Sequence, residues 1–272
     1  MSRRDCKGRV VLISGAAGGL GAALCRRYAA AGARIAAMDL DAQKLDALAA
    51  ELCASGAEVL ALRADITDPV ACTAAVVKTL EHFGELDGLI NNAGISHRSL
   101  LADTDPEVIR RVMEVNFFGA ANLTQDALAH IVARRGFIVA ISSVAGFAPL
   151  TGRSGYAASK HALHGFFDSL RSEVEGAGVD VTLVCPSFIR TGIGTAATDG
   201  SGAPVSSPRI TTGGESTPEV IAERVFAAVA TRRRMLLPDA TARKAWRLSR
   251  LAPGLYARIM KHKLGREFSG LP

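Results

Sequence analysis

Cysteine, aromatic residues and long apolar runs are all scarce in this sequence. Its 272 residues include 5 cysteines without C-x-x-C spacing, and only 5% are aromatic. So few, scattered cysteines exclude a disulfide scaffold and indicate reduced thiols in a cytoplasmic protein without a metal site. Every apolar run is shorter than the roughly 18 residues that a membrane span needs, and the polar first seven residues do not fit a signal peptide.

The bulk composition is that of a folded globular chain. Hydrophobic residues make up 49% and charged residues 21%, which excludes a disordered protein. The 27 glycines follow no period of three, which excludes a collagen-like chain. The chain is therefore expected to bury a large core, and no internal repeat divides it.

Positive charge is concentrated in the tail. From Arg232 onward eleven Lys/Arg face two Asp/Glu, a net of +9, while the remainder carries −3. Two basic amphipathic segments, broken at Pro253, make up residues 239–272. We expect a helical extension that packs near the substrate mouth or on a neighbouring subunit. Weak contact with a membrane surface is the alternative, and nucleic-acid binding is not expected because no reader motif accompanies the charge.

Strand-like apolar runs alternate with helix-like amphipathic segments through residue 237. The predicted strands are Val10–Ser14, Ala33–Asp39, Glu58–Asp65, Leu86–Asn91, Phe137–Ser142, Val179–Cys185 and Met235–Leu237. The predicted helices are Gly19–Ala31, Ala42–Ala54, Pro69–Phe83, Pro106–Arg134, Tyr156–Glu175 and Pro218–Thr231. This pattern predicts a single doubly wound, Rossmann-like α/β domain over residues 1–238, with a seven-stranded parallel sheet covered by helices on both faces.

A Gly-rich turn joins the first predicted strand to the first helix. Glycines allow positive φ and a close backbone approach, and the helix N-terminus attracts a pyrophosphate. We assign Gly15, Ala17, Gly19, Leu20 and Gly21 to a dinucleotide cofactor. Asp39, followed by the uncharged Leu40, ends the second strand, where a carboxylate binds the ribose hydroxyls of NAD and repels the 2′-phosphate of NADP.

Tyr156 and Lys160 stand four residues apart, on one face of a predicted helix. A phenol has a reference pKa of about 10, and a nearby ammonium favours the phenolate that could exchange a proton with an alcohol or carbonyl. Ser143 or Ser142 could hydrogen-bond the reacting oxygen, and periodicity does not choose between them. Asn116, a polar residue within a long helix, either packs as an amide or holds a water in a proton relay.

These motifs together resemble the short-chain dehydrogenase/reductase family over about residues 7–238. The matching residues are Gly15, Gly19, Gly21, Asp65, Asn91-Asn92-Ala93-Gly94, Asn116, Ser143, Tyr156, Lys160, Pro186 and Thr191. The resemblance implies Tyr156 as general acid/base, with Lys160 lowering its pKa and binding the nicotinamide ribose. It also implies Ser143 rather than Ser142 on the substrate oxygen and Asn116 on the relay water.

The same resemblance implies the rest of the cofactor site. Asp65 and Ile66 would contact adenine, Asn92 with Ala93 and Gly94 the nearby ribose region, and Pro186, Ile189 and Thr191 the carboxamide and phosphates. A homodimer or homotetramer is implied as well. Two positions depart from the family pattern: Ser14 replaces the usual Thr, and Ser187 follows Pro186 where Gly is usual. The second change puts details of the pocket in doubt.

The substrate pocket is expected to be largely apolar. Its predicted walls are Ile95, Ser96, His97, Val144, Ala145, Phe147, Pro149, Phe188 and a Gly/Ser/Thr/Pro-rich lid over about residues 190–216. Such walls suit a lipophilic secondary alcohol or ketone of steroid-like, aryl or long-chain type. Arg98 or Arg153 could reach an anionic group, so a 3-hydroxyacyl or polyol dehydrogenase is the alternative. A non-catalytic NAD-binding regulator is the rival class.

Overall fold

The computed structural model describes residues 4–190, 197–205, 211, 213–264 and 268. The strands are β1 (Val10–Ser14), β2 (Arg34–Asp39), β3 (Val59–Arg63), β4 (Gly88–Asn91), β5 (Phe137–Ile141), β6 (Asp180–Val184) and β7 (Met235–Leu236). In this described part they form one seven-stranded, fully parallel sheet in the order β3-β2-β1-β4-β5-β6-β7. The predicted fold class is confirmed.

Short polar caps begin many of the helices that connect these strands. The helices are α1 (Gly19–Ala30), α2 (Ala42–Ala54), α3 (Pro69–Phe83), α4 (Pro106–Met113), α5 (Gly119–Ala133), α6 (Ser154–Val174), α7 (Pro218–Ala230), α8 (Ala240–Leu251) and α9 (Pro253–Leu264). Asp41, Asp68, Asp105, Thr217 and Asp239 each accept a backbone N–H from the first turn that follows. These bonds satisfy N–H groups that have no partner within the helix, and so fix where each helix starts.

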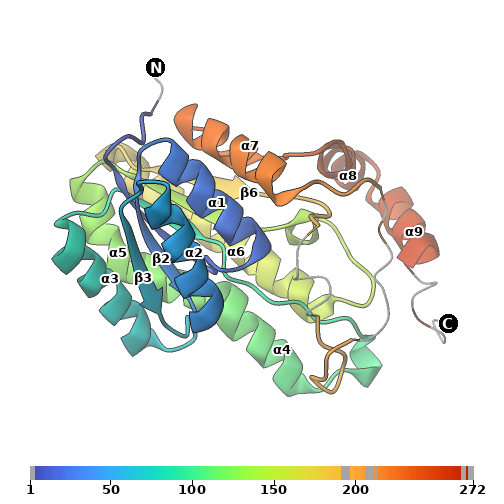
Figure 1. Cartoon of the computed structure of the whole chain (residues 1–272). Helices are drawn as coiled ribbons and strands as arrows, with labels where there is room; N and C mark the ends of the chain where they lie inside the picture. The colour runs from blue at the N-terminus through green and yellow to red at the C-terminus, as the bar shows by residue number, and fades with distance from the viewer. Residues whose placement is uncertain (1–3, 191–196, 206–210, 212, 265–267, 269–272) are drawn as a thin grey trace.

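Helices cover both faces of the sheet (Figure 1). Alternate residues of β1 point to opposite sides: Val11 and Ile13 pack with apolar residues of α1, α2 and α7. Val10 and Leu12 pack with those of α3, α5 and α6. Because both faces are buried, every residue of β1 is buried, which explains why it reads as a continuous apolar run.

The strand order reverses direction beside β1. This strand pairs with β2 on one side and β4 on the other, so Leu12 lies opposite both Ala36 and Leu89. The chain runs outward from β1 to β3 and then returns to β4. The loops after β1 and β4 therefore diverge, and leave a crevice at the carboxyl ends of the strands, where such sheets bind ligands.

The single helix predicted over Pro106–Arg134 is interrupted. The structure has α4, then a π-helical turn at Glu114–Phe118, then α5. A π turn carries one extra residue, and here it brings the Asn116 side chain to the backbone of Ile95. The pattern of apolar residues is too coarse to reveal one extra residue in a helix. The prediction of one continuous helix was therefore wrong here.

The tail forms the two helices α8 and α9, separated at Ala252 just before Pro253. Among the described residues, no helix combines the length and apolarity needed to cross a bilayer. Much of the predicted lid, including 191–196 and 206–210, lies outside the described residues. Oligomeric state and cytoplasmic location stay predictions.

Candidate active site

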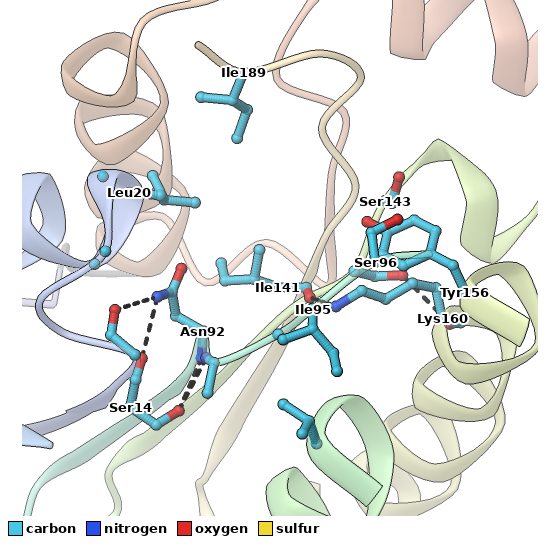
Figure 2. A pocket seen from close by; sticks show the side chains of 18 of the residues that line it. Ser14, Leu20, Asn92, Ile95, Ser96, Ile141, Ser143, Tyr156, Lys160 and Ile189 are labelled. Atoms are coloured by element: carbon cyan, nitrogen blue, oxygen red, sulfur yellow. Dashed lines mark hydrogen bonds between the residues drawn. The ribbon is translucent and has the colours of Figure 1, made fainter. Parts of the chain in front are cut away.

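A cavity of about 460 Å³ occupies the crevice at the carboxyl ends of the strands. Figure 2 shows Ser14, Leu20 and Asn92 on one side of it and Ser143, Tyr156 and Lys160 on the other. Its lining combines nearly all the residues predicted for the cofactor with three of the four predicted for catalysis; Asn116 is not among the described lining residues. Those present are Gly15, Gly19, Leu20, Gly21, Asp39, Leu40, Asp65, Ile66, Asn92, Ala93, Gly94, Ser143, Tyr156, Lys160, Pro186 and Ile189.

Glycine is required in the turn after β1 because backbone crowds it. Gly15 has φ +63°, and a Cβ there would lie 2.8 Å from the Cα of Ala93. A Cβ at Gly21 would lie 1.9 Å from the carbonyl oxygen of Gly15. Gly18 caps α1 without a side chain, so the first N–H groups of the helix face the cavity. This turn can therefore bind a diphosphate.

Asp39 is held at the end of β2 by the same turn. One carboxylate oxygen accepts the N–H of Ala17 at 2.9 Å, and the other accepts that of Asp41 at 3.0 Å. Ala17 itself is absent from the described cavity lining and reaches the site only through its N–H bond to Asp39. Each carboxylate oxygen has a second acceptor position, which leaves capacity for ribose hydroxyls.

Ser14 and Asn92 join the loops that follow β1 and β4. The Ser14 hydroxyl oxygen accepts the N–H groups of Asn92 and Ala93, at 3.1 and 3.2 Å. The Asn92 amide donates to the carbonyls of Ser14 and Gly15, at 3.1 and 2.9 Å. Serine therefore supplies, in place of the family's usual threonine, the hydroxyl that fixes both walls of the crevice.

The far end of the cavity is shaped by Asp65 and Ile66. Asp65 accepts the backbone N–H of Thr67 at 2.9 Å and its hydroxyl at 2.8 Å, and these bonds hold the pKa of Asp65 below its usual value. Ile66 is buried, and a Cβ at Gly119 would lie 2.8 Å from its side chain. Both residues line the cavity, and their contact with adenine stays a prediction.

Tyr156 and Lys160 lie on α6 with both side chains at the cavity. The Lys160 ammonium is 5.7 Å from the centre of the Tyr156 ring and donates to the carbonyl of Ile141 at 2.9 Å. Burial lowers the pKa of Lys160 from 10.5 to about 8, because a desolvated ammonium is disfavoured. The arrangement places a cation beside a phenol at the point where β5 ends.

Both polar atoms of the Asn116 amide are hydrogen-bonded to protein partners. Its oxygen accepts the N–H of Ile95 at 2.8 Å, and its nitrogen donates to the Ile95 carbonyl and the Ser159 hydroxyl, at 3.0 and 2.9 Å. Asn116 thus ties the π turn to α6 and to the loop after β4. This is the packing interpretation left open by the sequence, and the relay water stays a prediction.

The structure separates the two candidate serines by their partners. Ser142 interacts with the His164 ring nitrogen at 3.0 Å and donates to the Lys160 carbonyl at 3.4 Å. The Ser143 oxygen accepts the N–H of Ala145 at 3.2 Å, which leaves its hydrogen for a substrate oxygen. Both serines line the cavity, but Ser142 is bonded to residues of α6, whereas Ser143 lies beside Tyr156 (Figure 2).

Two residues outside the family motifs position this site. His97 is fully buried, and its Nε2 accepts the N–H of Gly155 at 3.0 Å, next to Tyr156. This bond requires a neutral ring protonated on Nδ1, which lies 3.2 Å from the Ser99 hydroxyl. Burial, with the charge of Arg153 adding to it, lowers the pKa of His97 and keeps the ring neutral. His97 is thus a structural histidine that satisfies the first turn of α6.

Asp239 holds the loop after β6. It accepts the backbone N–H and hydroxyl of Ser187, at 3.0 and 2.7 Å, and the N–H of Ala242 in α8 at 2.7 Å. Asp239 therefore connects the tail to the segment that begins at Pro186. Ser187, which stands where the family usually has Gly, therefore has Asp239 as a specific partner. The sequence did not indicate this contact because 52 residues separate the two.

The substrate end differs in part from the predicted walls. Ile95, Ser96 and Phe188 line the cavity, as does Ser187. His97, Val144, Ala145, Phe147 and Pro149 are not among the described lining residues: His97 is fully buried, and Val144 and Phe147 pack against the tail. Leu150 lines the cavity although the sequence did not place it on the wall. Arg98 and Arg153, which were expected to be able to reach an anionic group, also line it, as does Ala197 of the predicted lid. Thr191 lies outside the described residues.

Comparisons with known proteins agree with this geometry. The family profile described as short chain dehydrogenase matches residues 9–201. The dehydrogenase/reductase SDR family member 7B of Bos taurus is 39% identical over 97% of this chain and 84% of its own length. The protein of that name from Mus musculus is 38% identical over 98% and 84%.

Solved structures share the fold. A short chain dehydrogenase/reductase from Burkholderia phymatum in complex with NAD superposes with a TM-score of 0.84, at 27% identity over 93% of this chain and 96% of that one. A dehydrogenase/reductase from Sinorhizobium meliloti 1021 gives 0.74, at 30% identity over 85% and 92%. An archaeal alcohol dehydrogenase from Thermococcus sibiricus, complexed with 5-hydroxy-NADP, gives 0.74 at 23% identity over 85% and 96%, which shows the fold alone.

Proposed function

This chain belongs to the short-chain dehydrogenase/reductase family of oxidoreductases, and from that premise we propose that it interconverts a secondary alcohol and a ketone with NAD. The observation that carries the proposal is the meeting of Tyr156, Lys160 and Ser143 at one end of a cavity whose other end is a diphosphate-binding turn. When bound, NAD supplies the chemistry of accepting a hydride from the carbinol carbon.

The protein residues supply the proton chemistry. The Ser143 hydroxyl orients the substrate oxygen, and the Tyr156 oxygen takes the alcohol proton as the ketone forms. The buried Lys160 ammonium stabilises the phenolate that precedes this transfer, because opposite charges attract strongly in a desolvated site. In the reductive direction the Tyr156 phenol returns the proton to the carbonyl oxygen.

Asp39 supports the preference for NAD over NADP. Its carboxylate lines the cavity at the end of β2, is fixed by two backbone N–H groups, and is followed by the uncharged Leu40. A 2′-phosphate at this position would meet a fixed negative charge. Arg111 is the basic side chain nearby, and it lies 3.7 Å from Asp65, in an ion pair with it.

The substrate proposed is a lipophilic alcohol or ketone of steroid-like, aryl or long-chain type. Ile95, Leu150, Phe188 and Ala197 contribute apolar surface to the cavity, with Ser143 and Tyr156 as the polar focus. An apolar wall with few polar groups orients a substrate through its one reactive oxygen.

A second candidate, an alcohol that carries an acidic group such as a 3-hydroxyacyl compound, is favoured by one observation. Arg98 and Arg153 both line the cavity, and both are buried, at 7% and 8% exposure. Guanidinium groups at a substrate site suit carboxylates, phosphates and thioester headgroups, because they donate paired hydrogen bonds.

A substrate panel tests both candidates. Absorbance at 340 nm is followed with NAD or NADP and three sets of compounds: apolar secondary alcohols, 3-hydroxyacyl thioesters and polyols. We expect NAD-dependent turnover of the first set, and turnover of the second set alone would establish the second candidate. The Tyr156→Phe variant is the control, because it removes only the hydroxyl. Absence of turnover on every set, with NADH still binding, would overturn the proposed reaction and favour a non-catalytic NAD-binding regulator.

A further inference from the structure

We propose that the exposed side of α8 and α9 docks onto a bilayer that contains anionic lipid. This side, called the tail surface below, consists of Arg243, Lys244, Arg247, Arg250, Leu251, Leu255 and Arg258. Such docking would determine where the enzyme works, whatever alcohol it oxidises.

The tail surface is strongly and uniformly cationic. Residues 240–264 contain seven Lys/Arg and no Asp/Glu. On α8, Arg243, Arg247 and Arg250 follow at helical spacing of four and three residues, and all three are exposed. Several basic side chains on one helix face attract an anionic leaflet, and each adds to the affinity near the surface.

Two leucines project from the point where the helices meet. Leu251, the last residue of α8, is 85% exposed, and Leu255 in the first turn of α9 is 50% exposed. They flank Pro253 and Gly254, which are exposed as well. Large apolar side chains at the tip of a cationic surface are the composition of helices that lie in the membrane interface.

The fold does not need these leucines. The tail packs on the domain through its other side, where Ala245, Leu248, Tyr256, Met260 and Leu264 contact the segment after β5. That segment contributes Val144, Phe147, Ala148 and Leu150 to the same cluster. Each tail helix therefore has an inner apolar side that stabilises the fold, and Leu251 and Leu255 are additional to it.

A membrane explains this combination better than a nucleic acid does. Surfaces that bind single-stranded nucleic acid pair basic residues with exposed aromatic rings on which bases stack. The tail's Trp246 packs edge-on against Phe147, with ring centres 4.9 Å apart, and Arg250 covers it at 3.7 Å. Phe147 and Arg250 therefore both pack on the Trp246 ring. The large apolar side chains exposed on the tail surface, Leu251 and Leu255, are aliphatic.

Docking would bring the cavity mouth to the lipid. Leu150 belongs to the cluster beneath the tail and also lines the cavity. The tail helices lie at the end of the molecule opposite α3 (Figure 1). A lipophilic substrate could then enter from the bilayer without crossing water; this consequence rests on the proposed function, whereas the docking does not.

Vesicle co-sedimentation tests the docking without substrate or cofactor. The full chain is mixed with vesicles of phosphatidylcholine alone or with about 30% phosphatidylserine, at low and high salt. We expect binding to the anionic vesicles alone, weakening as salt rises. Lys244→Gln with Arg247→Gln should weaken it about 25-fold, at about fivefold per charge. Leu251→Ser with Leu255→Ser should weaken it about tenfold or more.

Matched controls separate the tail surface from general charge and hydrophobicity. Lys78→Gln and Val70→Ser change an exposed lysine and a 76% exposed valine on α3, and neither should alter vesicle binding. Turnover of a water-soluble substrate should be unchanged in the leucine variant, so a failure of the proposed reaction is seen separately. The proposal is overturned if wild type ignores anionic vesicles at low salt, or if the leucine variant binds like wild type. Preference for a DNA duplex over the vesicles, or a dimer that the leucine variant dissociates, would also overturn it.

Discussion

Replacing Lys160 by Met should stabilise the protein while abolishing turnover. Met has a similar unbranched shape but no charge, so it removes the ammonium without opening a large void. The Lys160 pKa falls from 10.5 to about 8 on folding. At 1.36 kcal/mol per pKa unit, holding the charged form in the folded state costs about 3 kcal/mol. Loss of the hydrogen bond to the Ile141 carbonyl destabilises the variant by about 1 kcal/mol. We therefore expect the free energy of unfolding to rise by about 2 kcal/mol at pH 7.

The pH dependence gives the sharper signature. Between pH 8 and 10.5 the unfolded chain binds more protons at Lys160 than the folded one, so this residue makes wild-type stability rise with pH. Buried thiols such as Cys25 and Cys185, whose pKa values are raised to about 12 by burial, act in the opposite direction in both proteins. Because Cys185 interacts with the Lys160 charge, the difference between variant and wild type reports Lys160 together with this interaction.

Urea unfolding of both proteins from pH 7 to 10 measures this difference. We expect the advantage of Lys160→Met to shrink by about 2–3 kcal/mol across that range. Lys78→Met, at an exposed site on α3, is the control and should show no such change. If Lys160→Met is less stable than wild type at pH 7, or its advantage does not vary with pH, then Lys160 is not held in a desolvated site.

Substitutions at three further residues, Asp39, His97 and Gly15, test separate parts of the site. Asp39→Ser should raise the ratio of kcat/KM for NADP to that for NAD at least tenfold, because it removes the fixed charge; an unchanged ratio would contradict the cofactor assignment. His97→Ala should lower the free energy of unfolding by about 1–3 kcal/mol, since it leaves a buried N–H of α6 unpaired. His97→Gln should retain that bond and lack the wild-type loss of stability below about pH 6.5, where the unfolded imidazole takes up a proton before the folded one; a loss of the same size in both proteins would refute this. Gly15→Ala should weaken NADH binding at least tenfold, as measured by fluorescence titration, whereas Gly165→Ala in an open part of α6 should leave binding intact and add about 0.5–1 kcal/mol of stability.

The sequence alone allowed us to predict the seven-stranded sheet and the residues of the Gly-rich turn that line one end of the cavity. Strands buried on both faces read as apolar runs, and Gly15 and Gly21 occupy places where a Cβ would meet backbone. Both signals can be read from the local sequence, although the crowding at Gly15 comes from Ala93 in the loop after β4. Ser143 needed more than periodicity: the resemblance chose it, and the structure shows Ser142 bonded to His164.

Features that depend on distant contacts escaped prediction. The π turn at Asn116 is tied to a loop some 20 residues earlier, and Asp239 reaches back across 52 residues to Ser187. Phe147 was expected on the substrate wall but packs on Trp246 of the tail. The position of the tail decides which residues of this loop reach the cavity, and no local pattern in the loop encodes it.

The central claim is that Tyr156 transfers the proton during hydride exchange with NAD. The most direct measurement pairs two quantities on Tyr156→Phe and wild type: the dissociation constant of NADH, and the turnover number on the best substrate of the panel. We predict an NADH affinity within about twofold of wild type, and turnover lower by about 100-fold or more. Turnover close to wild type in the variant would contradict the account and assign the proton transfer to another group.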